Sequence, residues 1–270
     1  MEKEIDEQLK TVYSQWLDEL KVVAPKFLSE DRYSNPYFAC VPKGWCDSDV
    51  RILIVGEEGH GVWGRGKSEG IGADDIQKIQ EYCWCSLVSY LGYEPKHELY
   101  PIQDKYEKLG SPFWNRARKL SEYGICAWTN LDSIHILGDS CELPDEDKVK
   151  LHSTKIKLLS EEIRLLKPTH VVFAGWYGIS LKEELPELYA ELYPNGLGDN
   201  SVWKKKVVYR QMDGINYICA YHPNWGARQK GYEDEVMRVF LETLKKSGGE
   251  PNEKDVAVCN GVMHCVFPEG

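Results

Sequence analysis

The segment RILIVG, residues 51–56, gives the strongest indication of the architecture. A short run of β-branched and other apolar residues that stops at a glycine is typical of a strand buried on both faces of a parallel sheet. The segments ICAWTN (125–130) and THVVFA (169–174) have the same character, and stretches with helical periodicity separate the three. Strands that alternate with helices predict an α/β sandwich with a central, mainly parallel sheet.

Helices are expected around these strands wherever apolar residues recur every three or four positions. An amphipathic helix over residues 2–22 is expected to pack onto the domain, and a polar loop is expected over residues 138–150. The remaining helices are expected at residues 73–91, 112–122, 154–166 and 179–192, and around Val236, Val239, Phe240 and Leu244.

A hairpin is expected near the carboxyl end of the sheet region. The pair Asp213-Gly214 is a turn signal between strands expected at residues 202–212 and 216–220. No internal repeat or low-complexity linker interrupts the pattern, so residues 1–246 are expected to form a single domain. The polar, glycine-rich tail at 247–270 suggests no role by itself.

The composition excludes several classes of protein. The chain has 270 residues, 42% of them hydrophobic and 28% charged, which suits a packed globule and excludes a disordered chain. Its net charge of −10 argues against a protein that coats nucleic acid over its whole surface, although a local basic groove stays compatible with it. No apolar run reaches the roughly 20 residues that a membrane-spanning helix needs.

The cysteines and the N-terminal residues indicate the compartment and the metal content. Nine cysteines at irregular spacing, behind a charged N-terminus without the apolar core of a signal peptide, favour reduced thiols in the cytoplasm. Cys259, His264 and Cys265 supply too few ligands for a structural zinc site. We therefore expect no metal and no cofactor, and we expect a monomer without a membrane partner.

Candidate functional residues follow the strands, because open α/β sheets form their sites at the carboxyl ends of strands. Glu57 and Glu58 come directly after the first strand, where a carboxylate can orient a water molecule. An ordinary glycine-rich turn remains the alternative reading of this loop. It lacks the glycine pattern of a nucleotide cradle, but Arg65 and Lys67 supply cations that could meet phosphates.

Two later strands also end in polar side chains. Asn130 closes the second strand, and its amide could both donate to and accept from the edge of a planar base. His222, followed by a proline, is a candidate donor to a developing anion, and Trp225 could wedge into a base stack. The alternatives are a turn asparagine and a capped helix with a packed tryptophan. Arg228 and Lys230 place cations before the final helix.

Taken in order, these loops resemble those of the uracil-DNA glycosylase superfamily. The resemblance spans roughly residues 50–245. The matching segments are RILIVGEEGHG (51–61), SPFWN (111–115), ICAWTNLDSI (125–134), EEIRLLKPTHVVFAGW (161–176) and YICAYHPNWGARQKGYEDEV (217–236). Members of that family have a strand followed by a carboxylate-bearing loop, a middle strand with an asparagine, and a late strand that ends in a His-Pro loop.

The resemblance implies a three-layer α/β/α fold and hydrolysis of the N-glycosidic bond of a base flipped out of DNA. Glu57 and Glu58 would orient water and stabilise the sugar cation, and His222 would donate to the departing base. The residues expected to line the base site are Gly56, Trp63, Asn130 and Asn224. The residues expected to contact DNA are Arg65, Lys67, Trp225, Arg228 and Lys230.

Two alternatives remain open at the level of the sequence. The first loop reads GEEGHG without the proline of the family pattern, and the late loop reads HPN in place of HPS. With the acidic net charge, these departures are compatible with a glycosylase-fold protein that binds nucleic acid or nucleotides without cleaving them. The third reading is an unrelated α/β enzyme that acts on a small molecule.

Overall fold

The computed structural model describes residues 1–56, 71–81, 83, 111–137, 143–175, 178–193, 207–226 and 229–246. A five-stranded sheet runs through it in the order β2-β1-β3-β5-β4. The strands are β1 (Arg51–Gly56), β2 (Ile125–Asn130), β3 (His170–Ala174), β4 (Val208–Met212) and β5 (Ile215–Ala220). All neighbouring strands are parallel except β4 and β5, which form an antiparallel pair. The predicted α/β sandwich with a mainly parallel sheet is confirmed.

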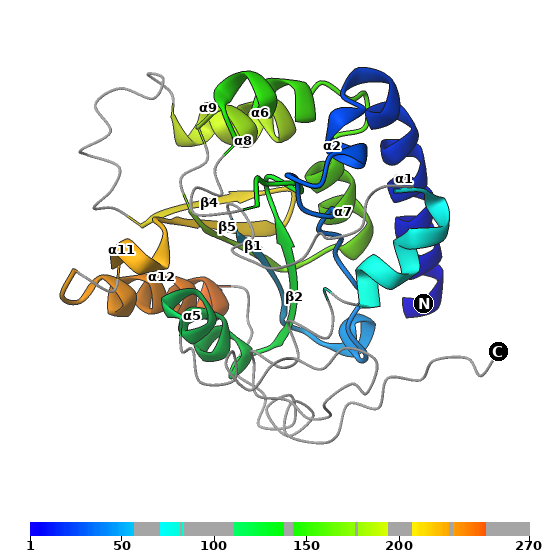
Figure 1. Ribbon diagram of the computed structural model, residues 1–270. Helices are drawn as coiled ribbons and strands as arrows, with labels where there is room; N and C mark the ends of the chain where they lie inside the picture. Colours follow the sequence, from blue (N-terminus) through cyan, green and yellow to red (C-terminus); the bar gives the residue numbers. More distant parts are fainter. Residues whose placement is uncertain are drawn as a thin grey trace.

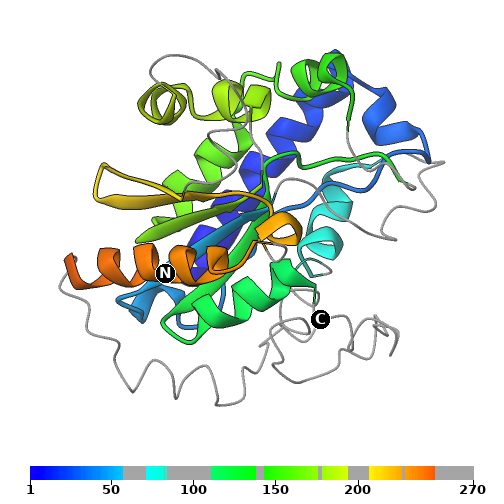
Figure 2. The same ribbon diagram turned by 90° about the vertical axis from the view of Figure 1, so that its left-hand side faces the viewer.

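Helices cover both faces of the sheet, which gives three layers (Figure 1 and Figure 2). One face packs against α1 (Glu2–Val23) and α7 (Leu158–Leu166), and the other against α5 (Pro112–Ser121) and α12 (Tyr232–Lys246). The shorter helices are α2 (Lys26–Ser29), η1 (Trp45–Asp47), η3 (Ala73–Asp75), α6 (Asp145–Leu151), α8 (Gly178–Glu184), α9 (Pro186–Leu192) and α11 (Pro223–Gly226).

The apolar run in β1 explains why both faces must be covered. Side chains alternate between the faces of a strand, so Leu53 and Val55 join the core under α1 and α7, whereas Ile52 and Ile54 join the core under α5 and α12. All four are essentially inaccessible to solvent. Because both faces of this strand are buried, none of these side chains faces water, and the sequence is a continuous apolar run.

The N-terminal helix is part of the main core. Tyr13 of α1 stacks on Phe38 with ring centroids 4.0 Å apart, and its hydroxyl donates to Glu162 of α7 at 2.9 Å. Glu162 is fully buried, and this burial raises the pKa of its carboxyl to about 7, although hydrogen bonds from the Ala39 amide and from Tyr13 act in the opposite direction. The prediction of an amphipathic helix at residues 2–22 is confirmed.

The hairpin between β4 and β5 is also confirmed. Asp213 and Gly214 have φ angles of 50° and 78°. A two-residue turn that matches the twist of its strands requires positive φ at both positions, and the Asp-Gly pair tolerates this conformation.

The structure differs from the helix predictions in three details. The region expected to be a polar loop over residues 138–150 contains α6, whose first turn carries three acidic residues that stabilise the positive end of the helix dipole. The helix expected at residues 154–166 is α7, which begins only at Leu158. The helical stretch expected near residues 179–192 is present and is divided into two helices, α8 and α9. The break lies at Leu185, which has φ −135° and precedes Pro186, and a residue before proline is disfavoured in the helical conformation.

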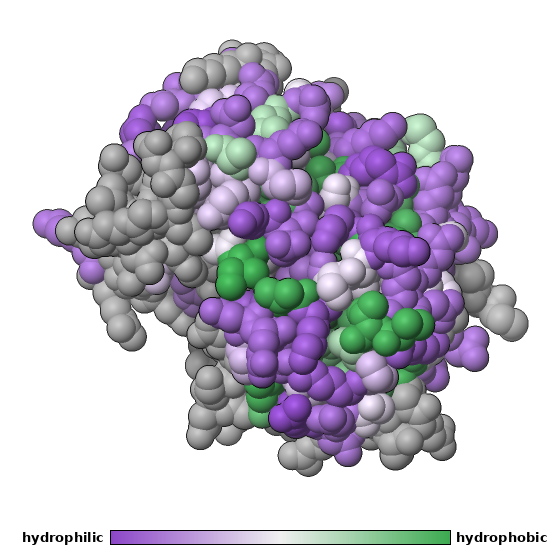
Figure 3. Space-filling model, turned by 90° about the horizontal axis from the view of Figure 1, so that it is seen from above, coloured by the Kyte–Doolittle hydropathy of each residue, from purple (hydrophilic) through white to green (hydrophobic). Residues whose placement is uncertain are grey.

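The described surface offers no extended apolar face on the side seen in Figure 3, where hydrophobic side chains form small separate patches among hydrophilic ones. The large hydrophobic residues that are exposed in the described part of the chain are Met1, Val22, Val23 and Val149. None of the helices described has the length and the apolar character that a membrane crossing demands.

Candidate functional site

The carboxyl ends of four strands lie in one row across the sheet. Gly56 of β1 pairs in register with Asn130 of β2 and with Ala174 of β3, and Ala174 pairs with Ala220 of β5. The chain leaves β1 toward β2 on one side and leaves β3 toward β5 on the other, so the strand order reverses between β1 and β3. Ligands of open α/β sheets bind at such a reversal, outside the carboxyl ends of the strands.

The four residues of this row face the layer of α5 and α12, because Ile54, Val172 and Ile218 two positions earlier in their strands belong to that core. Three of the four residues are glycine or alanine, so Asn130 carries the longest side chain of the row. Gly56 is required for this arrangement, because a Cβ atom there would lie 2.3 Å from Asn130 Oδ1.

The amide of Asn130 has an unused donor. Its side chain is 2% exposed, and its Oδ1 accepts a hydrogen bond from Trp128 Nε1 at 3.2 Å. An indole N–H can only donate, so this contact assigns the oxygen and the nitrogen of the amide. Asn130 Nδ2 is buried and has no hydrogen-bond partner among the residues that the structure describes. A buried donor without a partner costs about 1–3 kcal/mol, so its presence indicates a group that completes it on binding.

An aromatic ring lies beside this amide. Phe113 Cε2 is 3.5 Å from the position that a Gly56 Cβ would occupy, and the ring is half-buried. Its orientation is set by the start of α5, where Ser111 caps the helix by accepting from the Trp114 amide at 3.3 Å. Trp114 packs edge-on against both Phe113 and Trp128. The sequence signal was present in SPFWN, but it indicated only the start of a helix.

The His222 loop lies at the same edge of the sheet. The ladder between β3 and β5 ends at Ala220, and α11 begins at Pro223, so His222 occupies the short connection between them. His222 is half-buried, and its carbonyl accepts from the Gly226 amide at 3.1 Å. β5 and β2 are separated by β3 and β1, which places their ends roughly 14 Å apart, with the ends of β1 and β3 between them.

The structure therefore brings Gly56, Asn130 and His222 to one edge, as the strand-end rule predicts. Lys230 is exposed between α11 and α12. Asn224 and Trp225 belong to α11, but their side chains are outside the described part of the structure. The other candidates also lie outside the described residues: Glu57, Glu58, Trp63, Arg65, Lys67 and Arg228.

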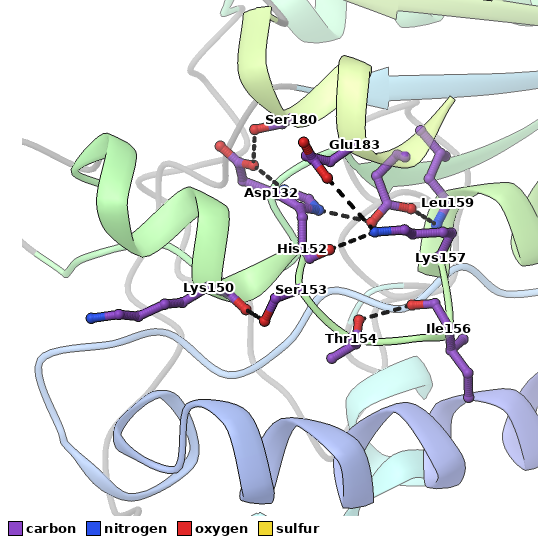
Figure 4. A network of polar contacts seen from close by, with 11 residues as sticks. Asp132, Lys150, His152, Ser153, Thr154, Ile156, Lys157, Leu159, Ser180 and Glu183 are labelled. Carbon is purple, nitrogen blue, oxygen red and sulfur yellow. Dashed lines mark hydrogen bonds and ion pairs between the residues drawn. The ribbon is translucent and has the colours of Figure 1, made fainter. Parts of the chain in front are cut away.

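A second polar cluster begins two residues after Asn130 (Figure 4). Asp132 Oδ1 accepts from His152 Nε2 at 2.8 Å and from Ser180 Oγ at 2.7 Å. The other ring nitrogen of His152 is 2.8 Å from Glu184 Oε1, and Glu184 Oε2 accepts from the Leu159 amide at 3.0 Å. The ammonium group of Lys148 adds a cation 3.9 Å from Asp132 Oδ2. We refer to Asp132, His152, Ser180 and Glu184 as the His152 cluster.

The imidazole in this cluster is charged at neutral pH. Burial by itself lowers the pKa of His152, but hydrogen bonds to Asp132 and Glu184 outweigh burial and raise the pKa to about 9. Both ring nitrogens then donate to carboxylates. The cluster ties the loop after β2 to the end of α6 and to α8, and sequence reasoning missed it because its four residues come from segments far apart in the chain.

Comparison with known proteins identifies no relative by sequence. No model of a protein family matches this chain, and no curated protein matches it either. The proposed function therefore rests on the geometry of the site and on the order of the motifs in the sequence.

Proposed function

We propose that this chain is a DNA glycosylase-like hydrolase that cleaves the N-glycosidic bond of a flipped base of the uracil type. The observation that carries the proposal is the unpartnered Nδ2 of Asn130, which is buried beside the Phe113 ring at the reversal of strand order. The order of the strand-end motifs, which resembles that of the uracil-DNA glycosylase superfamily, supports it independently.

The chemistry of the free amide donor favours a particular class of base. Asn130 Nδ2 needs an acceptor, and the Trp128 contact prevents the amide from turning its oxygen toward the ligand instead. The carbonyl edge of uracil or hypoxanthine supplies an acceptor, whereas the amino groups of cytosine and adenine present donors. A flat base would also stack on Phe113, because aromatic rings stabilise a flipped base through its π-face.

His222 and the two glutamates would share the hydrolysis. As the glycosidic bond breaks, its electron pair leaves with the base nitrogen, and His222 donates a hydrogen bond to the base as negative charge develops. Glu57 and Glu58 would orient the water whose oxygen bonds to the sugar carbon and would stabilise the cationic sugar. The proton released by the water balances the charge of the departing base.

A second candidate function, binding of nucleic acid or nucleotides without cleavage, is favoured by the GEEGHG and HPN loops, which depart from the family pattern. The first turn of α12 carries Glu233, Asp234 and Glu235, and α12 contacts α11 next to the His222 loop. Glu233 and Glu235 are paired with Arg116 and Arg238, but Asp234 adds a negative charge close to the site. For either function, the cations expected at Arg65, Lys67, Arg228 and Lys230 would have to attract DNA phosphates against the acidic net charge. For either function we propose a monomeric cytoplasmic protein, in keeping with the five free thiols in the described residues.

Release of free base from oligonucleotides containing uracil or hypoxanthine, in single and double strands, tests the proposal. We expect activity on at least one of these substrates and a loss of about 10- to 100-fold in Asn130→Ala, because a hydrogen bond to a buried donor is removed. Glu57→Ala, Glu58→Ala and His222→Ala should lower the rate further, without loss of folding.

Gln211→Ala is the matched control, because it removes an exposed amide near the amino end of β5. The proposal is wrong if the wild-type chain releases no base. The site assignment is wrong if activity survives all four substitutions. DNA binding at low salt without base release would support the second candidate.

A further inference from the structure

The segment that carries His222 is held from outside the sheet by one buried arginine. Arg116 of α5 is 2% exposed. Its Nε and Nη2 donate to the two carboxylate oxygens of Glu233 at 3.0 and 2.6 Å, and its Nη1 donates to the carbonyl of Tyr221 at 3.2 Å. Sequence reasoning did not single out Arg116, because its partners Tyr221 and Glu233 lie more than 100 residues further along the chain.

Arg116 holds one end of the segment from Tyr221 to Gly226, and its partner Glu233 lies against the other end. The β3–β5 ladder ends at Ala220, so the backbone of Tyr221 needs partners other than a neighbouring strand. Arg116 donates to the Tyr221 carbonyl, and the Tyr221 amide donates to the Tyr232 hydroxyl at 2.7 Å. At the other end, a Cβ on Gly226 would lie 2.6 Å from Glu233 Oε1, the oxygen that Arg116 holds.

We propose that Arg116, through its fork-shaped contact with Glu233 and Tyr221, is the positioning residue that sets the place of the His222 imidazole. The catalytic consequence rests on the proposed function. A donor to a developing anion acts only if it is already in place when the charge appears, and a small displacement of a catalytic group greatly reduces the rate. A planar guanidinium can hold three acceptors at once, whereas a lysine ammonium cannot reproduce this geometry.

The test combines kinetics with a spectroscopic signal that does not need activity. The variants are Arg116→Met, Arg116→Lys and the double variant Arg116→Met/Glu233→Met, in which an apolar pair replaces the ion pair so that no buried charge is left alone. Arg238→Met is the matched control, because Arg238 makes a similar two-point contact with Glu235 on the exposed side of α12. NMR signals of the His222 imidazole are assigned with His222→Asn.

In Arg116→Met and in the double variant, we expect kcat for base release to fall about 100-fold with a much smaller change in KM. The His222 signals should shift or broaden, while those of His152 and His170 stay in place. Arg116→Lys should be intermediate, and Arg238→Met should match the wild type.

Unchanged His222 signals and base release in the folded double variant would overturn the inference and leave Arg116 a structural role only. If the wild-type chain releases no base but the His222 signals still move when Arg116 is replaced, the proposed function fails and the positioning role stands. If the signals do not move, the positioning role fails whether or not base is released.

Discussion

Asn130 and Asp132 are two residues apart at the end of β2, and both are 2% exposed, yet their surroundings differ completely. Asp132 accepts hydrogen bonds from His152 and Ser180, inside a cluster in which both imidazole nitrogens have carboxylate partners. Asn130 has a partner for its oxygen and, within the described part of the chain, none for its nitrogen. Both side chains are equally buried, but Asp132 is a carboxylate paired with cations, whereas Asn130 is a neutral amide with incomplete hydrogen bonding.

Under the proposed function, this difference separates a structural polar group, Asp132, from a binding one, Asn130. A buried charged cluster with every member paired fixes the relation between the elements that supply it, here the loop after β2, α6 and α8. A buried donor left open at the ligand-binding edge of an α/β sheet has no such structural role. Substitutions in the His152 cluster should therefore change stability, and substitutions around Asn130 should change function more than stability.

The largest expected effect is on stability, from His152→Ala. Removal of the imidazolium leaves Asp132 and Glu184 buried without their shared cation, and breaking a buried ion pair by removing one partner costs about 3–5 kcal/mol. Chemical denaturation at pH 7 measures the loss. Ser153→Ala, an exposed neighbour, should change the free energy of unfolding by less than about 0.5 kcal/mol. A similar, small change in both variants would contradict a structural role for the cluster.

The next largest effect is a dependence of stability on pH. The pKa of His152 is raised to about 9 in the folded protein, so the folded state binds more protons than the unfolded state between pH 6.5 and 9. This contribution is fully present below pH 6.5 and is lost as the pH rises through 9, by roughly 3 kcal/mol. Denaturation curves collected from pH 7 to 9.5 should show the decline.

The contribution of Glu162 to the pH dependence of stability must be separated from that of His152. Its raised folded-state pKa of about 7 also makes stability fall as pH rises, but the fall is complete near neutral pH. Glu162→Gln should flatten the profile between pH 4.5 and 7 and leave the decline toward pH 9 unchanged. A decline toward pH 9 that disappears in Glu162→Gln would show that His152 is not its source.

The smallest expected effect on stability comes from Gly56→Ala, the substitution next to the Asn130 amide. The new Cβ would lie 2.3 Å from Asn130 Oδ1, which forces the amide away from Trp128. Overpacking of this kind costs about 1–3 kcal/mol, but base release should be lost almost entirely. Gly72→Ala is the matched control, since nothing lies within 4 Å of its new Cβ. Full base release by Gly56→Ala would show that the position of the Asn130 amide does not matter.

Much of the fold was predictable because it depends on local patterns. The strand at residues 125–130 matches β2, and the strand at 169–174 matches β3 apart from its first residue. Both segments are apolar because both faces of the sheet are covered, a property that the sequence displays directly. α6 was missed because five of its seven residues are charged, so its sequence shows no apolar periodicity. Tertiary contacts, such as that of Asp147 with Lys26, stabilise this helix.

The site was predictable only where it follows from strand ends. Asn130 and His222 were candidates because Asn130 ends an apolar strand and His222 follows one, and parallel strands place their carboxyl ends together. Phe113, Arg116 and His152 were missed because their roles depend on contacts between segments far apart in the chain, such as Arg116 with Glu233. No pattern of spacing within a single segment records such a contact.

The hairpin has a consequence for association between molecules. β4 covers the outer side of β5, the strand that leads to His222, and Tyr209 of β4 clamps the pair by donating to Asn216 Oδ1 at 3.0 Å. The exposed Arg210 and Gln211 then lie on the outermost strand. Charged and polar residues on an edge strand discourage sheet-to-sheet aggregation. The antiparallel strand thus shields β5, and the segment with His222 that follows it, from pairing with another copy of the chain at this edge of the sheet.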